Sequence, residues 1–423
     1  MNEAGACRWP EPPAAGPLGD GRHASARLRP GSVADLCSAV RDGVRSGMAL
    51  YPQGGATAID YGGPPARPGV LIDTRGLDRV IDYPHADMTI TVEAGITAAE
   101  LATVLAAKDQ RLLVEVPQAD RATLGGVFAT GVCGPRRFAW GRPRDQIIGV
   151  RFVTSEGVEV KGGGRVVKNV AGYDLPKLLT GSLGTLGILT SMTLKVRPRP
   201  ESSAVAWTRL DPGHDLEAIL AGLNTTAARP VAVEILDAHS AAIVGEDAGL
   251  PAAQRVLAVG FEGSADSVRW QLDRLEEELP PGRVTRAEGD GAERLWAGLT
   301  EFQVQAPGPV SVVVAMRPSR VAWFLDVVDG SPWTFQCHAG DGIVRLHGLD
   351  DPGEDAMAGR IESLRGLARE ADGTLIVPRC PTAWKPRLRV WGDPRPDWGL
   401  AAKVKHALDP DGALNPGRFV GST

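Results

Sequence analysis

Three glycine-rich segments lie far apart in this sequence and have the composition of backbone sites for phosphate groups. The first is Pro52-Gln53-Gly54-Gly55-Ala56-Thr57, which follows the apolar residues 48–51. Successive glycines can expose consecutive backbone N–H groups with no side chain in the way, and the Thr57 hydroxyl can add a donor. The segment suits a pyrophosphate, although a simple turn explains the same composition equally well.

The second segment is Thr123-Leu124-Gly125-Gly126, and more small residues follow it, among them Thr130 and Gly131. Small side chains at nearly every other position indicate a helix start that lies against a flat, bulky ligand, because larger residues would fill that space. Close packing between secondary-structure elements is the alternative explanation.

The third segment, Gly181-Ser182-Leu183-Gly184-Thr185-Leu186-Gly187-Ile188, opens a run typical of a strand. A tight glycine turn directly before an extended strand leaves backbone groups uncovered by side chains, and these groups can hydrogen-bond an adenine edge. A Rossmann fingerprint needs a strand before its glycines and a helix after them, whereas here a helix is expected before and a strand after. A Walker loop needs a following Lys and Ser or Thr, which are absent. The sequence therefore predicts a different kind of nucleotide site.

Length and charge limit the class of protein. With 423 residues, of which 43% are hydrophobic and 23% charged, the chain can form two or three globular domains. Its formal net charge of −5 provides no broad basic field for a nucleic acid or an anionic lipid surface. We therefore expect no nucleic-acid partner.

Cysteine spacing and hydropathy exclude further classes. The five cysteines are scattered, odd in number and never spaced as C-x-x-C, so we expect neither an iron–sulfur cluster nor a structural zinc held by this chain alone. Stretches of about 18 apolar residues are absent, so direct membrane insertion is not expected. We expect a cytoplasmic location, with any contact with the inner membrane made through partners. The cysteines are Cys7, Cys37, Cys133, Cys337 and Cys380.

Changes in texture along the chain predict four segments. Residues 1–24 are expected to form a flexible leader, and residues 25–199 an α+β domain with one clear helix that has Thr97 as N-cap and Glu100 three positions later. Residues 200–395 are expected to form an antiparallel sheet covered by helices on one face. Its helices are expected at 214–223, 264–279 and 355–370, and the last segment, 396–423, must dock on one of the two domains.

Together and in this order, the three glycine segments resemble the PCMH-type FAD-binding domain of the vanillyl alcohol oxidase and p-cresol methylhydroxylase superfamily. Within it, other motifs are most similar to the FAD-binding subunits of bacterial glycolate oxidases. The resemblance implies an α+β chain in which this domain, at residues 25–199, is followed by an antiparallel-sheet cap domain at residues 200–395. It also implies that the C-terminal segment 396–423 docks back on the FAD-binding domain. The motifs are Gly131-Val-Cys-Gly134-Pro135-Arg136-Arg137, Gly141-Arg-Pro-Arg144-Asp145, Val167-Lys-Asn-Val-Ala-Gly-Tyr-Asp174 and the ending Asp409-Pro-Asp-Gly-Ala-Leu-Asn415-Pro-Gly-Arg418.

The resemblance also implies one FAD. Relatives that attach FAD covalently often carry a His directly after the Gly-Gly pair, where this chain has Ala56, so we expect non-covalent FAD. The first two segments are expected to surround the pyrophosphate and residues 184–188 to face the adenosine and the flavin. Lys168 and Tyr173 are candidates for the flavin edge, with a structural role at a helix start as the alternative. The predicted cofactor-binding residues are Pro52, Gln53, Gly54, Gly55, Ala56, Thr57, Thr123, Leu124, Gly125, Gly126, Thr130, Gly131, Gly184, Thr185, Gly187, Ile188 and Asn415.

The cap region contains a candidate catalytic centre. Cys337-His338-Ala339-Gly340-Asp341-Gly342 resembles the first half of the H-A-G-D-G-N-L-H loop of D-2-hydroxy-acid dehydrogenases. That resemblance implies that His338 takes the hydroxyl proton while hydride leaves the α-carbon for the flavin, and that Arg345 binds the carboxylate. The second half of the loop differs, and His347 lies further along the chain. In those dehydrogenases histidines of the loop hold a metal and the substrate, so the resemblance gives His338 and His347 a catalytic or metal-binding role, with a structural role as the alternative.

Three hypotheses stay open at this point. In the first, the chain is the FAD-binding subunit of a glycolate oxidase complex and cooperates with a paralogous FAD subunit and an iron–sulfur subunit to oxidise glycolate to glyoxylate. In the second, it is a stand-alone D-2-hydroxy-acid dehydrogenase of the D-lactate type. In the third, it is a structural partner without flavin.

Overall fold

The computed structural model describes residues 16–165, 172–211, 213–245, 250–251, 255–279 and 284–420. The chain divides into two compact units. Unit 1 comprises Met1–Val132, Arg142–Pro198 and Asp393–Thr423, and unit 2 comprises Cys133–Gly141 and Arg199–Gly392. The short segment Cys133–Gly141, which the sequence placed in the flavin domain, thus packs with unit 2. The C-terminal segment packs with unit 1.

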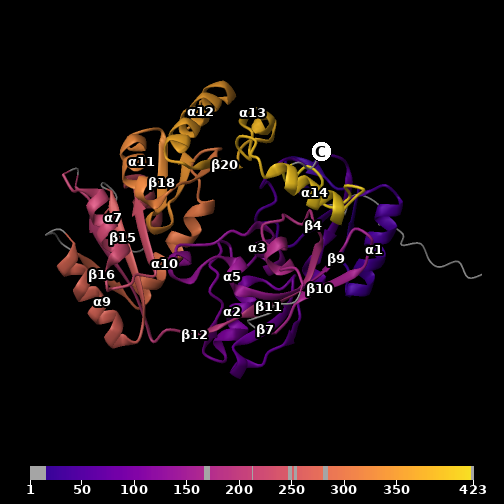
Figure 1. The fold of residues 1–423 in the computed structure, drawn as a ribbon, viewed down its shortest axis with the longest axis horizontal. Coiled ribbons are helices and arrows are strands. Elements are labelled where there is room, and N and C mark those ends of the chain that lie inside the picture. The colour runs from indigo at the N-terminus through magenta and orange to yellow at the C-terminus, as the bar shows by residue number, and fades with distance from the viewer. Residues whose placement is uncertain are drawn as a thin grey trace, which may run out of the picture. The chain divides into compact units, whose positions relative to one another are not determined.

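Unit 1 is built on two sheets (Figure 1). Three parallel strands in the order β3-β5-β4 form the first, and five antiparallel strands in the order β10-β9-β11-β7-β6 form the second. The strands are β1 Pro17–Gly19, β2 Arg22–His23, β3 Ala26–Leu28, β4 Ala49–Gln53, β5 Gly69–Asp73, β6 Val80–Asp82, β7 Thr89–Glu93, β8 Gln110–Arg111, β9 Ile147–Val153, β10 Glu159–Gly163, β11 Ile188–Lys195 and β12 Arg197–Pro198; the helices are α1 Val33–Arg45, α2 Ala98–Ala106, α3 Leu124–Thr130, α5 Pro143–Gln146, α6 Leu175–Leu179 and α14 Trp398–Leu408.

Local sequence signals account for the helices that frame these sheets. Helix α1 begins after Ser32, whose side chain accepts from the Asp35 N–H, and it buries Leu36, Ala39 and Val40 at helical spacing. Helix α2 has the capping box predicted from Thr97 and Glu100, which is confirmed. The third glycine segment follows α6 and precedes β11, also as predicted.

The N-terminal prediction needs a correction. Residues 16–24, expected to belong to a flexible leader, contain the antiparallel strands β1 and β2. The buried Arg418 guanidinium fixes them, because its Nη1 donates to the Asp20 carboxylate at 2.7 Å and Nη2 bonds the Leu18 carbonyl. Residues 16–24 are therefore held by a contact with the far end of the chain.

Unit 2 is built on one eight-stranded antiparallel sheet, which we call the large sheet, in the order β16-β13-β15-β14-β18-β19-β17-β20 (Figure 1). Its strands are β13 Ser202–Arg209, β14 Ala232–Leu236, β15 Val256–Gly263, β16 Thr285–Glu288, β17 Ser311–Ala315, β18 Trp333–His338, β19 Ile343–Gly348 and β20 Thr374–Arg379; its helices are α4 Arg137–Trp140, α7 Leu216–Thr225, α8 Ala238–Gly245, α9 Ala265–Glu278, α10 Asp290–Glu301, α11 Val321–Val328, α12 Glu354–Glu370 and α13 Lys385–Leu388.

Helices cover both faces of the large sheet, so the prediction of a single covered face is wrong. Alternate strand residues point to opposite faces, and Ala204 and Ala206 of β13 join one apolar cluster while Val205 joins another. The first cluster includes α7, α9, α11 and α12, and the second includes α8 and α10. The sequence analysis did not predict α8 or α10, which supply the second layer.

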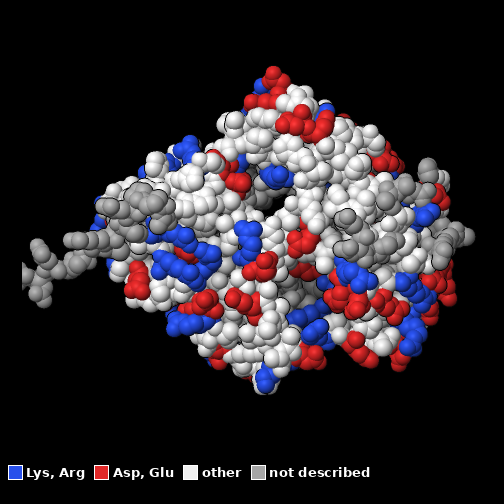
Figure 2. Space-filling model, turned by 180° about the vertical axis from the view of Figure 1, so that it is seen from behind, with Lys and Arg blue, Asp and Glu red and all other residues white. Residues whose placement is uncertain are grey.

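Charged side chains on the surface are mixed in sign. On the face shown in Figure 2, Lys and Arg side chains alternate with Asp and Glu side chains instead of gathering in a field of one sign. Among the described residues, no helix is both long and apolar enough to cross a membrane.

Candidate flavin site and the polar face of the large sheet

The first two glycine segments lie against each other in unit 1. We call residues 52–57 the first glycine loop and residues 121–126 the second. A Cβ atom at Gly54 would overlap the Thr123 side chain, and one at Gly55 would overlap the Arg121 carbonyl oxygen. The Arg121 guanidinium also donates to the Gly55 carbonyl at 3.2 Å. Glycine is therefore required at both positions because the two loops are in direct contact.

The third glycine loop, residues 181–187, reaches the same place. A Cβ atom at Gly184 would lie 2.9 Å from Cγ of Pro52 in the first loop. Leu183 and Gly184 both have left-handed backbone, with φ of 54° and 67°, and the Leu183 carbonyl accepts from the Asn415 side-chain amide at 2.6 Å. Segments about 60 residues apart in the sequence thus converge, as the prediction of a nucleotide site requires.

The first loop supplies the backbone donors. Within the described residues, the N–H groups of Gly54, Gly55 and Ala56 donate no hydrogen bond to the chain. Ala56 has left-handed backbone, with φ of 59°, and changes of backbone hand between neighbouring residues turn successive N–H groups toward one concave site. Such donors suit a phosphate anion, so the residues present fit the pyrophosphate of FAD.

The second loop contributes in a different way from the one predicted. Its N–H groups at the start of α3 already have acceptors: Leu124 donates to Ile96, Gly125 to Ala94 at 2.7 Å, and Gly126 to the Thr123 hydroxyl at 3.4 Å. These bonds fix the position of α3. The second loop therefore shapes the site by close approach, while the first loop carries the available donors.

Several other predicted cofactor-binding residues bond within their own loops. The Thr130 hydroxyl donates to the Gly126 carbonyl at 2.9 Å, and the Thr185 hydroxyl donates to the Ser182 carbonyl at 2.7 Å. The Gln53 carbonyl accepts from the Thr74 hydroxyl at 3.2 Å. The remaining predicted residues have structural positions of their own: Leu124 and Ile188 in the core, Gly131 as the left-handed C-cap of α3, and Gly187 against Phe152. Direct contact of these residues with FAD remains a prediction.

The structure says little about the two residues that are candidates for contact with the flavin edge. Tyr173 is 91% exposed, and Lys168 lies outside the described residues.

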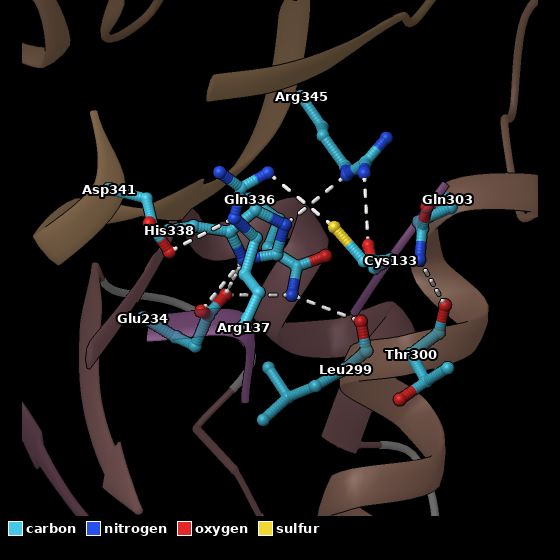
Figure 3. A network of polar contacts seen from close by, with 10 residues as sticks. All are labelled: Cys133, Arg137, Glu234, Leu299, Thr300, Gln303, Gln336, His338, Asp341 and Arg345. Carbon is cyan, nitrogen blue, oxygen red and sulfur yellow. Dashed lines mark hydrogen bonds and ion pairs between the residues drawn. The ribbon is translucent and has the colours of Figure 1, made fainter. Parts of the chain in front are cut away.

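In unit 2, the predicted catalytic residues lie on one face of the large sheet, which we call the polar face. Figure 3 shows His338 and Arg345 on it. The apolar residues of β18 and β19, such as Cys337 and Val344, point to the opposite face. The polar face is defined by Glu234 on β14, Gln336 and His338 on β18, and Arg345 and His347 on β19.

His338 is held from both sides. It lies directly opposite Glu234 in the strand register, and its Nδ1 lies 2.7 Å from a Glu234 carboxyl oxygen. On the other side of the ring, Arg345 Nε donates to His338 Nε2 at 3.2 Å. An acceptor at Nε2 places the ring proton on Nδ1, where it is donated to Glu234. The His338 Nε2 lone pair is therefore already used by an arginine.

Glu234 is buried within this network. Burial raises the pKa of its carboxyl well above the ordinary glutamate value, while the hydrogen bond from Gln336 acts in the opposite direction. Gln336 Nε2 donates to Glu234 at 2.8 Å and to the Leu299 carbonyl at 3.0 Å. Glu234 was not among the residues predicted from the sequence, although a single acidic residue inside the apolar run 231–236 was a signal for it.

His347 belongs to a separate environment. Its Nδ1 lies 2.8 Å from the Ser311 hydroxyl and its Nε2 lies 2.8 Å from the Phe302 carbonyl, so Nε2 carries the proton. The ring is 2% exposed, and burial lowers its pKa to about 4. Both ring nitrogens have partners, as expected of the structural alternative, and the structure does not bring His347 into the bonds around His338.

The segment 133–141 completes the network, and the sequence analysis did not foresee this role. Arg345 Nη2 donates to the Cys133 carbonyl at 3.2 Å, and Arg137 Nε lies 3.2 Å from an Asp341 carboxylate oxygen. Arg136 stacks 3.8 Å from the Trp296 ring and pairs with Glu262 at 2.8 Å. Among the described residues, no group of three or more His, Cys, Asp or Glu side chains has the arrangement of a metal site.

Comparisons with known proteins define the class of the chain. Residues 24–163 match the family described as an FAD binding domain, which confirms FAD as the predicted cofactor. The structure of an alkyldihydroxyacetonephosphate synthase is similar over 94% of this chain and 78% of that one, with a TM-score of 0.66 and 16% identity. This likeness concerns the fold alone, and it agrees with the predicted α+β class; the FAD-binding domain rests on the family match.

Two relatives carry more specific names. Glycolate oxidase subunit GlcE of Escherichia coli (strain K12) is 36% identical over 169 residues, which are 40% of this chain and 48% of that subunit. The match thus spans about half of that relative. D-2-hydroxyglutarate dehydrogenase of Xanthomonas citri pv. viticola is 26% identical over 417 residues, covering 92% of this chain and 88% of the enzyme. The predicted class, an FAD-dependent oxidoreductase, agrees with both names.

Proposed function

We propose that this chain is an FAD-binding subunit of a glycolate oxidase complex, in which glycolate is oxidised to glyoxylate and electrons pass through FAD. The observation that carries the proposal is the hydrogen bond from Arg345 Nε to His338 Nε2. When bound, FAD supplies the acceptor for the hydride that leaves the α-carbon. A base must take the hydroxyl proton at the same time, and the His338 nitrogen suited to this task already accepts a hydrogen bond from Arg345.

In this proposal the chain's own residues hold the cofactor and do not move a proton. The N–H groups of the first glycine loop bind the pyrophosphate, and the second and third loops hold it in place. Asn415 holds the third loop through the Leu183 carbonyl. A paralogous FAD subunit would supply the base, and an iron–sulfur subunit would take the electrons. The scattered cysteines and the partial match to a named glycolate oxidase subunit support this division.

A second candidate function is that of a stand-alone D-2-hydroxy-acid dehydrogenase. The observation that favours it is the match over 92% of the chain to an enzyme named as such a dehydrogenase. It requires Arg345 to leave His338 Nε2 and bind the substrate carboxylate, after which the freed nitrogen could accept the hydroxyl proton.

One experiment separates these functions. The purified chain is expected to show the flavin absorption bands and to keep them when glycolate or D-lactate is added without oxygen. Adding the two partner subunits should restore glycolate-dependent dye reduction. Bleaching of the flavin in the isolated chain would instead support the second function, and a chain that never binds FAD would contradict both.

A further inference from the structure

Lys405 of α14 lies inside unit 1, and its ammonium group has three acceptors. Nζ donates to the Thr185 carbonyl at 2.7 Å and to the Leu414 carbonyl at 2.9 Å, and it pairs with the Asp409 carboxylate. Thr185 belongs to the third glycine loop, whereas the other two partners belong to the C-terminal segment. One side chain of α14 thus links the end of the chain to the candidate flavin site.

Asp409 bonds both Lys405 and the backbone of the C-terminal segment. Its carboxylate is fully buried and accepts from the backbone N–H groups of Ala413 at 3.0 Å and Leu414 at 2.8 Å. Burial lowers the pKa of the Lys405 ammonium, and the Asp409 carboxylate acts in the opposite direction. A buried ammonium is stable only with such partners. Residues 409–414 therefore form a tight turn that needs the Lys405 cation.

The same turn is attached to β4, the strand that leads into the first glycine loop. Leu414 bridges Leu50 of β4, the strand that leads into the loop, because the Leu50 N–H donates to the Ala413 carbonyl and the Asn415 N–H donates to the Leu50 carbonyl, both at 2.8 Å. Asn415 then holds the Leu183 carbonyl. The C-terminal turn thus contacts both the strand that leads into the first glycine loop and the third loop, which approaches Pro52.

We propose that Lys405 is a positioning residue for FAD, and that the C-terminal turn 409–415 and the cofactor stabilise each other through the third glycine loop. The third loop has left-handed backbone at Leu183 and Gly184, a conformation that a non-glycine residue adopts only when its surroundings hold it. Carbonyl acceptors at Leu183 and Thr185, on either side of Gly184, are both held by the C-terminal segment. Loss of the Lys405 donors would free one side of the loop.

The inference rests on FAD binding by this chain and not on the identity of its substrate. A matched set of variants tests it: Lys405→Met removes the ammonium, Lys405→Arg keeps a cation, and Lys403→Met changes an exposed lysine of the same helix. FAD affinity is measured by quenching of flavin fluorescence on the apo-chain, whose fold is checked by circular dichroism. We expect Lys405→Met to weaken FAD binding by roughly tenfold or more, Lys405→Arg to recover part of it, and Lys403→Met to leave it unchanged. Unchanged affinity in Lys405→Met, or no recovery in Lys405→Arg, would overturn the proposal.

Hydrogen exchange of the unmodified chain gives a test that does not depend on the folding of any variant. Addition of FAD is expected to slow exchange at the Ala413 and Leu414 amides, which bond to Asp409 and not to the cofactor. Equal exchange with and without FAD would contradict the coupling. A chain that binds no FAD at all would instead defeat the proposed function, so the two failures can be told apart.

Discussion

The first glycine loop of unit 1 and the polar face of unit 2 differ in how their polar groups are bonded. In the loop, three backbone N–H groups donate to no described part of the chain. On the polar face, the side chains of Glu234, His338 and Arg345 are hydrogen-bonded to one another. The loop has the features of a binding site, because its backbone N–H groups can donate to a ligand. The polar face has the features of a closed network, because His338 bonds Glu234 on one side and Arg345 on the other. From residue types alone, the polar face would have been expected to be the functional site, because His and Arg are the usual catalytic groups.

The comparison predicts that small changes in the first loop will abolish cofactor binding. Gly55→Val places a side chain where the Arg121 carbonyl lies, so the first and second loops must move apart. We expect FAD affinity to fall by roughly 100-fold or more. The absorbance ratio of flavin to protein in the purified chain measures this loss.

The control is Gly359→Ala in α12, where nothing lies within 4 Å of an added Cβ atom. This change should stabilise the helix by roughly 0.5–1 kcal/mol and leave the flavin content unchanged. Full flavin content in Gly55→Val would show that the contact between the two loops does not hold the cofactor.

His347 predicts how unit 2 responds to acid. Its pKa is about 4 in the folded chain and about 6.5 when unfolded, so between these values the unfolded state binds a proton that the folded state does not. The contribution of the neutral His347 ring to the free energy of unfolding is therefore fully present above pH 6.5. It is lost as the pH falls toward 4, by about 3 kcal/mol in total. Urea unfolding at pH 7, 6 and 5 measures the slope, and His347→Gln should flatten it. An unchanged slope in that variant would assign the acid sensitivity to other groups.

Arg345→Met tests whether the polar face is closed. The change leaves His338 Nε2 without the Arg345 donor, and an unsatisfied buried acceptor costs about 1–3 kcal/mol. We expect lower stability in urea with unchanged FAD affinity, while Arg269→Met on the exposed side of α9 should change neither. If Arg345→Met makes the isolated chain reduce its flavin with D-lactate, Arg345 is what blocks His338. Loss of FAD would contradict the separation between the two regions.

Glu234→Gln is expected to have the smallest effect. The amide keeps an acceptor for His338 but removes the buried carboxyl, whose raised pKa means that the folded chain retains this proton to higher pH than the unfolded chain. Wild-type stability should therefore decline as the pH rises from the ordinary glutamate pKa toward the raised value, and the variant should lack that decline. Near pH 5 we expect the two chains to differ by less than about 1 kcal/mol. The difference between their urea midpoints across pH 5–8 decides this.

The sequence by itself determined the positions at which the backbone must carry no side chain. The Gly-Gly pair at residues 54–55, the capping box at Thr97 and the turn between α6 and β11 depend on short-range chemistry, so their types and spacing were sufficient. The matching order of three such segments was enough to predict the FAD-binding domain, its fold class and its cofactor.

Only the tertiary structure decided which polar groups are available and which are used. Glu234 and His338 are 104 residues apart and meet because β14 and β18 are neighbours in the large sheet. Lys405 reaches Thr185 across 220 residues, and α8 and α10 cover a face that periodicity did not reveal. A hydrogen-bond partner is set by strand order and helix docking, which depend on contacts remote in sequence. The composition of a motif therefore identifies a possible site, and the packing around it determines whether its groups can act.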